Sequence, residues 1–236
     1  HNMSWLRAAR REAGALWILM LVLLAGALNA AGVIQFGQTL SHMTGNLTKL
    51  GLSLAAGSPA LLIGGFLLAF LLGATVSGYA FPTHSLGLWQ RCGFVLLTCG
   101  GLLLISESLP FPDALRMVAV AGVLGAQNGL ALRYRGILTR TTHMTGHLTD
   151  CGAALGRMLH SRRFLGEDLR LFLFHLLCLI FFALGVVFVA WSSPWLRERI
   201  GLDAIDLAAV CYLLAGGFTL LRVVWHRWNL RREDVP

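Results

Sequence analysis

The sequence predicts an all-α polytopic membrane protein, with six transmembrane helices and two short half-helices arranged as a 3+3 inverted repeat. Its 236 residues are 56% hydrophobic and only 13% charged, whereas soluble domains average about 25% charged residues. Several apolar runs reach the roughly 20 residues that are needed to cross a bilayer. A ten-residue polar motif also occurs twice, at residues 42–51 and 143–152, with seven identical positions. We therefore expect two related halves embedded in a membrane.

Each predicted half contains three apolar spans and a short helix that follows its first span. Residues 1–14 comprise a tag remnant, His1 and Asn2 ahead of Met3, and a basic segment. The first repeat, 15–109, has spans at 15–36, 59–81 and 92–109, and its short helix lies within 37–58. The second repeat, 115–225, has spans at 115–132, 171–191 and 207–225, and its short helix covers 147–159. Loops are expected at 82–91, 110–113 and 133–140, and residues 226–236 form a basic tail. The short helices are too short to span a bilayer alone.

Small residues recur every four positions on two of the predicted spans. They are Gly65, Ala69, Gly73 and Ser77 on the second span, and Ala121, Gly125 and Gly129 on the fourth. Such ridges let two helices approach closely. They fit either packing inside the protein or contact with a second copy in a homodimer, and the sequence leaves both alternatives open.

The distribution of arginine predicts the orientation of the spans. The formal net charge is +8, but no soluble domain is large enough to bind a duplex, so nucleic acid is not an expected partner. With six spans, the segments on the side of the N-terminus carry most of the arginines, notably within residues 7–11, 133–140 and 157–163. Cytoplasmic loops are enriched in Arg and Lys, so both termini are expected in the cytoplasm. Because each half has an odd number of spans, the two halves are expected to be inverted relative to each other.

The repeated motif has the composition of a solute-binding site. Thr44-Gly45 and Thr145-Gly146 precede the short helices, and Thr is a common N-cap while Gly lets the backbone turn sharply. A helix N-terminus carries a partial positive charge and attracts anions, although the glycines also fit simple tight packing. If the two helix starts meet near the membrane midplane, the substrate-binding residues are Asn29, His42, Thr44, Gly45, Asn46, Thr48, Asn128, His143, Thr145, Gly146, His147 and Thr149.

Lys49 in the first motif is replaced by Asp150 in the second. Charged groups inside a membrane are costly and tend to be paired and functional. Lys49 and Asp150 are therefore expected to act in charge or proton coupling, either paired with each other or each facing its own vestibule. Snorkelling toward a membrane surface is the alternative for both side chains.

Three other polar features of the sequence are candidates for chemical roles. His143 and His147 are four residues apart, but no Cys or carboxylate set accompanies them, so no metal and no cofactor are expected. Glu107 lies between Ser106 and Ser108 near the end of a span, which predicts an interfacial position. His175 is isolated in the fifth span, where it either faces a cavity or donates to a neighbouring helix carbonyl.

The motifs together resemble those of a known family. The T-G-N motif, the L-G-L-x-L-A-x-G continuation at 50–57, the Q-N-x-x-L-R element at 127–133 and the T-T-H-M-T-G-x-L-T-D block at 141–150 are similar to the YoaK-like family of small bacterial membrane proteins. The resemblance covers most of the chain. It implies a multi-pass protein of the bacterial inner membrane and no established substrate. The sequence departs from the family pattern near Asn29, where an acidic residue is expected.

The predicted function is a secondary transporter for a small polar or anionic solute, with protons as a candidate coupling ion. The alternative is a passive channel for anions or small solutes, in which the short helices act as pore half-helices. A membrane-embedded enzyme is a third alternative, but no complete set of catalytic residues occurs within one motif, so no enzymatic activity is expected. The expected partners are the lipid bilayer, the solute and, through the small-residue ridges, a second copy of the chain.

Overall fold

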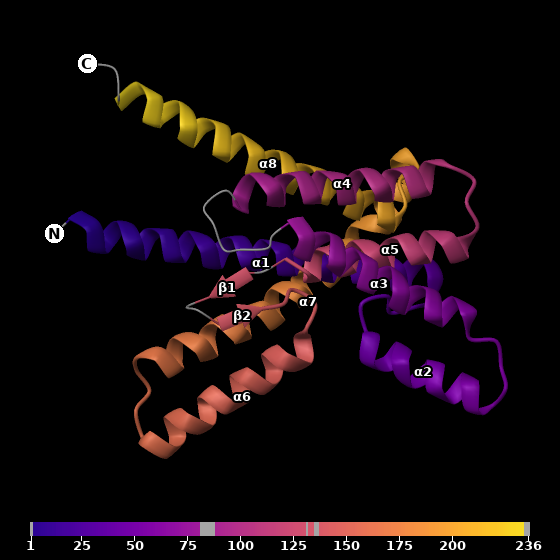
Figure 1. Cartoon of the computed structure of the whole chain (residues 1–236), viewed down its shortest axis with the longest axis horizontal. Coiled ribbons are helices and arrows are strands. Elements are labelled where there is room, and N and C mark those ends of the chain that lie inside the picture. Colours follow the sequence, from indigo (N-terminus) through magenta and orange to yellow (C-terminus); the bar gives the residue numbers. More distant parts are fainter. Residues whose placement is uncertain (1, 81–87, 131, 135–136, 234–236) are drawn as a thin grey trace.

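The computed structural model describes residues 2–80, 88–130, 132–134 and 137–233, which form eight helices and one small hairpin. The first half contains α1 (Asn2–Phe36), α2 (Met43–Ala55), α3 (Leu61–Ala80) and α4 (Leu88–Ser108). The second half contains α5 (Asp113–Asn128), β1 (Leu132–Tyr134), β2 (Ile137–Thr139), α6 (Met144–Ser161), α7 (Glu167–Ile200) and α8 (Ala204–Glu233). The long helices form a bundle, and α2 and α6 lie along one flank of it (Figure 1).

Four helices in the described ranges are long and apolar enough to cross a membrane. They are Gly14–Phe36, Leu61–Ala80, Glu167–Ile200 and Ala204–Trp225. Cys92–Ser108 of α4 is also apolar but shorter, and α5 has 16 residues. The predicted helical fold is confirmed, and these apolar helices agree with a membrane protein. A set of six full spans stays a prediction.

The fourth predicted span, residues 115–132, is wrong at its C-terminal end. Helix α5 ends at Asn128, and the side-chain oxygen of Asn128 accepts a hydrogen bond from the backbone N–H of Thr142 at 3.2 Å. Its backbone carbonyl accepts a second bond from the Arg140 guanidinium at 2.8 Å. The basic loop predicted at 133–140 contains an antiparallel pair, in which Leu132 lies opposite Thr139. These polar partners from the returning chain end the helix before the apolar run is complete.

Other helix boundaries lie outside their predicted positions. Helix α4 begins at Leu88, within the loop predicted at 82–91, of which residues 82–87 lie outside the described residues. Helix α6 begins at Met144 rather than 147, α7 exceeds the span 171–191 at both ends, and α8 continues through most of the predicted tail. Glu167 and Asp168 form the first turn of α7. Carboxylates there are stabilised by the partial positive charge of the helix N-terminus, which explains the earlier start.

The main helix pairs each join one helix of the first half to one of the second. Helix α1 packs on α7, α3 packs on α5, and α4 packs on α8. The short helices instead pack within their own halves, α2 on α3 and α6 on α7. If the halves are exchanged (α1 for α5, α2 for α6, α3 for α7 and α4 for α8), this set of pairs maps onto itself.

Glycines allow two of these pairs to touch backbone to backbone. A Cβ atom on Gly26 of α1 would lie less than 3.0 Å from the Phe182 carbonyl oxygen of α7. A Cβ atom on Gly125 of α5 would meet the Phe70 carbonyl oxygen of α3 equally closely. The reverse contacts are as tight, since Gly185 of α7 faces the Leu23 carbonyl and Gly73 of α3 faces the Gly122 carbonyl. The two pairs therefore use the same arrangement of small residues.

The predicted small-residue ridges of α3 and α5 pack against each other. Gly65 faces the side chain of Val118, Gly129 faces the backbone of Ala74, and the Ser77 hydroxyl donates to the Ala126 carbonyl. Between the two open alternatives, packing inside the protein is the one that the structure shows.

Gln127 joins three helices in the centre of the bundle. Its side chain is fully buried, and its amide donates to the Leu21 carbonyl of α1. Its amide oxygen accepts a hydrogen bond from the Tyr212 hydroxyl of α8. A buried amide is costly unless it is hydrogen-bonded, so this bonding fixes α5 relative to α1 and α8.

We predict that Gly73→Ala destabilises the protein, whereas Gly64→Ala on the same helix does not. The Gly73 methyl group would enter the backbone of α5, while nothing lies within 4 Å of a Cβ atom on Gly64. Overpacking typically costs about 1–3 kcal/mol, and alanine in an open helical position is favoured by up to about 1 kcal/mol. Thermal unfolding of the purified variants in detergent measures the difference. Equal melting temperatures would contradict the packing described above.

Candidate functional site

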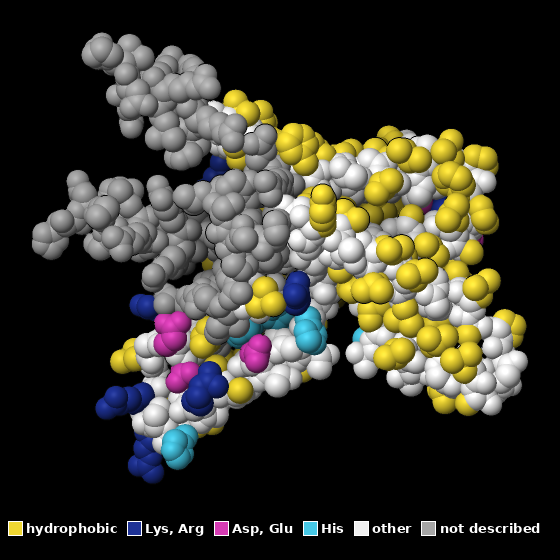
Figure 2. All heavy atoms as spheres, viewed as in Figure 1, with side chains coloured by type: hydrophobic (Ala, Val, Ile, Leu, Met, Phe, Trp, Pro, Cys, Tyr) yellow, Lys and Arg dark blue, Asp and Glu magenta, His cyan; other side chains and the backbone are white. Residues whose placement is uncertain are grey.

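The repeated motif forms the N-terminus of α2 in the first half and of α6 in the second. Both helices begin near the middle of the molecule, and they run toward opposite ends (Figure 1). In the space-filling view an open notch separates the lobe that contains α6 from the lobe that contains α2 (Figure 2). The two helix starts are thus placed on either side of the notch, and α2 and α6 do not form one of the main packed pairs.

The N-cap residues are histidines and not the predicted threonines. His42 caps α2 with φ −88° and ψ 72°, and His143 caps α6 with φ −90° and ψ 63°. The cap lies earlier because the helical backbone already includes Met43 and Met144. Neither cap side chain bonds to its helix. Thr44 and Thr145 consequently lie in the first helical turn, where both side chains are exposed.

Each capping histidine folds over the motif glycine three residues later. A Cβ atom on Gly45 would lie 2.7 Å from Nδ1 of His42, and one on Gly146 would lie 3.2 Å from Nδ1 of His143. Both distances are tighter than ordinary Cβ contacts, so the ring occupies the space that a side chain would need. Glycine at this position leaves room for the imidazole ring, whereas the sequence suggested a sharp turn or tight helix packing as its purpose.

The loops before the two helices are held by equivalent hydrogen bonds. The Asn29 side-chain oxygen accepts from the Ser41 hydroxyl at 2.7 Å, and that of Asn128 accepts from the Thr142 N–H. The Asn46 amide donates to the Thr39 carbonyl at 3.5 Å, and His147 Nε2 donates to the Arg140 carbonyl at 3.0 Å. Asn29 corresponds to Asn128, and Asn46 corresponds to His147. Each of these side chains therefore holds the loop that precedes the motif helix of its own half.

These contacts divide the predicted substrate-binding residues into two groups. Asn46 and His147 are buried and bonded to their own halves. The hydroxyls of Thr48 and Thr149 donate to carbonyls of their own helices, those of Thr44 and Thr145. Of the residues predicted to bind solute, the exposed side chains of the first turns are His42, Thr44, His143 and Thr145.

Lys49 and Asp150 do not form an ion pair with each other in the described structure. The Lys49 ammonium donates to the side-chain oxygen of Gln38 at 3.3 Å. Asp150 is 57% exposed, and its Oδ2 lies 3.9 Å from Nε2 of His175. Of the alternatives that the sequence left open, a direct pair between Lys49 and Asp150 is the one that the described structure lacks.

His175 does not fit either predicted role, because its partner is another imidazole. His175 Nδ1 lies 2.9 Å from Nδ1 of His147, and both side chains are buried between α6 and α7. Burial lowers the pKa of His147 below its ordinary value. Within the described ranges, no group of three or more His, Cys, Asp or Glu side chains is arranged to hold a metal ion.

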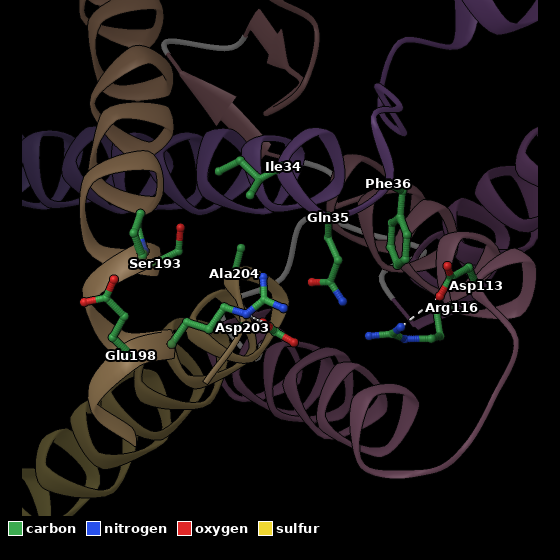
Figure 3. Close-up of a pocket in the computed structure, with 11 residues that line it drawn as sticks. Ile34, Gln35, Phe36, Asp113, Arg116, Ser193, Glu198, Asp203 and Ala204 are labelled. Atoms are coloured by element: carbon green, nitrogen blue, oxygen red, sulfur yellow. Dashed lines mark hydrogen bonds and ion pairs between the residues drawn. The ribbon is translucent and has the colours of Figure 1, made fainter. Parts of the chain in front are cut away.

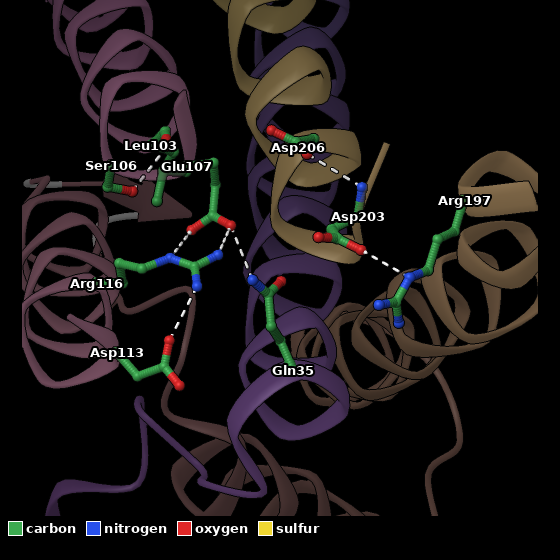
Figure 4. Close-up of polar contacts among 9 residues, drawn as sticks. All are labelled: Gln35, Leu103, Ser106, Glu107, Asp113, Arg116, Arg197, Asp203 and Asp206. Carbon is green, nitrogen blue, oxygen red and sulfur yellow. Dashed lines mark hydrogen bonds and ion pairs between the residues drawn. The ribbon is translucent and has the colours of Figure 1, made fainter. Parts of the chain in front are cut away.

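A second polar cluster joins α1, α4 and α5 around Glu107. The Arg116 guanidinium of α5 donates to both carboxylate oxygens of Glu107, and the Gln35 amide of α1 donates to one of them at 2.8 Å (Figure 4). The Glu107 side chain is only 4% exposed. The tight turn at 110–112 returns Arg116 to Glu107 and supplies a partner for its buried charge. The position of Glu107 at a membrane interface stays a prediction.

The same cluster borders a cavity of about 480 Å³ at one end of the bundle. Gln35, Asp113 and Arg116 line one side, and Ser193 and Glu198 of α7 line the other (Figure 3). Arg197 of α7 is also among the lining residues. Arg197 also pairs with Asp203 at 3.3 Å. This cavity lies outside both motifs, and no sequence pattern predicted it.

A family model described as a protein of unknown function, DUF1275, matches residues 17–220. The chain belongs to this family. The match includes both motifs and every main helix pair. No curated protein and no solved structure matches the chain. Membership in a family of unknown function agrees with the prediction, while the YoaK-like name and a bacterial source stay predictions.

We predict that Lys49→Ala and Asp150→Ala have additive effects on the free energy of unfolding. Their side chains have separate partners, and sites without a shared partner usually add within about 0.5 kcal/mol. Chemical denaturation of both single variants and the double variant in detergent measures the coupling. Recovery of stability in the double variant would indicate a direct pair and contradict the structure.

We predict that Glu107→Ala is far more damaging than Asp113→Ala, although both carboxylates bind Arg116. Breaking a buried pair typically costs about 3–5 kcal/mol, whereas an exposed pair contributes about 0–1 kcal/mol. Asp113 is 69% exposed and serves as the matched control. The same denaturation measurement compares them, and similar losses would mean that Glu107 is accessible to water.

Proposed function

We propose that the protein is a secondary membrane transporter for a small polar or anionic solute, with its site in the notch between the starts of α2 and α6. The supporting observation is that two helix N-termini open toward this notch, each with an exposed histidine and threonine in its first turn. Unpaired backbone N–H groups and the helix dipole favour a negatively charged or polar ligand. Imidazole and hydroxyl groups add hydrogen-bond donors and acceptors.

A 3+3 inverted repeat is part of this proposal. The set of packed helix pairs is unchanged when each helix of the first half is exchanged for its counterpart in the second. The glycine contacts of α1–α7 and α3–α5 are also equivalent. Both observations support the repeat. The residue order along these contacts makes α1 parallel to α7 and α3 parallel to α5, while α4 and α8 are antiparallel. Alternating access in inverted-repeat transporters arises from movement of such units around a central site.

The proposal places both termini in the cytoplasm and the protein in the bacterial inner membrane. The arginine distribution supports this orientation. In it, α6 lies in the half of the molecule toward the termini and α2 lies in the other half (Figure 1). The cavity beside Glu107 would then open to the outside.

The test is uptake of isotopically labelled formate, nitrate or inorganic phosphate into liposomes that contain the purified protein. A transporter gives saturable uptake, and preloaded unlabelled anion accelerates it by counterflow. A channel gives flux that follows the membrane potential without counterflow, and an enzyme gives neither. Absence of protein-dependent flux for these and further small polar solutes would refute the proposal.

We predict that the double variant Gly45→Ala/Gly146→Ala reduces this uptake at least tenfold. The added methyl groups displace the rings of His42 and His143 from the helix starts. Gly51→Ala/Gly152→Ala is the matched control, since these glycines lie later in the same helices with nothing within 4 Å. If both double variants transport alike, the seated histidines are not part of the solute site.

A further inference from the structure

The buried histidine pair between α6 and α7 has a bonding pattern that sets its protonation. His147 Nε2 faces the Arg140 carbonyl at 3.0 Å. A carbonyl only accepts, so this nitrogen carries the hydrogen, and in neutral His147 the Nδ1 atom is an acceptor. Nδ1 of His175 lies 2.9 Å from it and must therefore be the donor. Neutral His175 then has its lone pair on Nε2, the nitrogen that faces Asp150.

This arrangement leaves one position for an added proton. A proton on His175 Nε2 gives an imidazolium whose two N–H groups point at the His147 Nδ1 lone pair and at the Asp150 carboxylate. A proton on His147 Nδ1 would instead set two N–H groups against each other across 2.9 Å. The pair therefore accepts a single proton, and Asp150, which is 57% exposed, connects it with water.

Among the described residues, the surroundings supply one counter-charge, Asp150. On α6, Asp150 acts on both imidazoles and His143 acts on His147. Arg140 offers its carbonyl to the pair, while its guanidinium donates to the Asn128 carbonyl. Of the other helices that pack on α7, α1 has no charged side chain within 14–36, and the described charged residues of α8 are Asp206 and Arg222. The ring of Phe174 lies against both imidazoles, with centroid distances of 6.4 Å and 5.4 Å, and excludes water.

The first half lacks this site although its backbone is equivalent. Asn46 takes the place of His147, and Lys49 that of Asp150. Phe70 and Gly73 of α3 correspond to Phe182 and Gly185 of α7 in their contacts. At the same residue offset, Ile63 of α3 corresponds to His175 of α7. None of the three substitutes is an imidazole or a carboxylate, so the site belongs to one half alone.

We propose that the His147–His175 pair, with Asp150 as its counter-ion, is the proton-binding site of this protein, one proton being taken up on His175 Nε2 and released to water past Asp150. The inference rests on the proposed transport function, because proton binding at the α6–α7 interface would couple solute movement to a proton gradient. It goes beyond that function by assigning the coupling ion and the residues that hold it.

The first test needs no solute. Protein labelled with ¹⁵N-histidine is titrated in nanodiscs, and NMR reports which nitrogen of each imidazole is protonated. We expect His147 as the Nε2–H tautomer, His175 as the Nδ1–H tautomer, and formation of one imidazolium on His175. His175→Gln should remove this uptake of one proton. Asp150→Asn, a change at an exposed side chain, should move its midpoint to lower pH, because an opposite charge favours the protonated ring.

His160→Gln provides the matched control, since His160 is exposed at the far end of α6. It should change neither the tautomers nor the midpoint. The inference is overturned if His147 and His175 each form an imidazolium, if His175 is protonated on Nε2 alone when neutral, or if Asp150→Asn leaves the midpoint unchanged.

The second test separates this inference from the proposed transport. Liposomes that accumulate one of the labelled anions are given an inward proton gradient, and His175→Gln should lose gradient-driven uptake while counterflow persists. Uptake by the parent that ignores the gradient would overturn the coupling site and leave transport standing. If the NMR results hold but no solute moves, transport fails and the proton-binding site stands.

Discussion

Backbone-to-backbone contact at four glycines is the constraint on which the rest of the structure depends. Gly26 and Gly185 bring α1 and α7 together, and Gly73 and Gly125 do the same for α3 and α5. In lipid, where apolar side chains gain little by leaving their solvent, such close approach supplies the van der Waals contact that holds helices together. Each pair also carries a motif helix, because α2 packs on α3 and α6 packs on α7. The positions of the two helix starts follow from these contacts.

The two motifs share a scaffold and differ in the chemistry behind it. The N-cap histidine, the glycine below it and the asparagine that binds the preceding loop are the same in both halves. Behind this shared surface, Asn46 makes one loop contact, whereas His147 makes the same contact and also reaches α7. The shared surface is the one at which we propose that the solute binds. Because His147 contacts His175 and Asn46 has no such partner among the described residues, the two halves have unequal electrostatic properties behind their motifs.

Features with a local pattern were predictable from the sequence. Apolar runs and four-residue spacing of small residues predicted the helices and the facing ridges of α3 and α5. Repetition of the motif predicted equivalent helix starts. The β1–β2 hairpin was not predictable in this way, because Leu132–Tyr134 is short and lies among arginines that read as a loop. Asn128 ends its helix through partners twelve and fourteen residues later.

Features that depend on partners from other helices were missed or misassigned. Asn46 and His147 were expected among the solute-binding residues because both belong to the repeated motif, and both proved to be buried. A signal was available, since an isolated His175 in an apolar span requires a polar partner and the second motif has one histidine more than the first. Glu107 offered a similar signal, because Arg116 follows it across a proline-containing turn that returns the chain. Gln127 had no such signal, as its partners Leu21 and Tyr212 lie about a hundred positions away on either side.

The pairing of helices between halves bears on the origin of the chain. Within the described part of the first half, α2 packs on α3, whereas α1, α3 and α4 make their largest contacts with helices of the second half. Under the proposed inverted repeat, a half-length ancestor would have needed a second copy of itself, inserted in the opposite direction, to cover the faces that make these contacts. Duplication and fusion of its gene would have kept every contact while freeing the two copies from having to be identical. His147, His175 and Asp150 of the second half correspond to Asn46, Ile63 and Lys49 of the first. A symmetric dimer of identical chains cannot acquire such a difference between its halves.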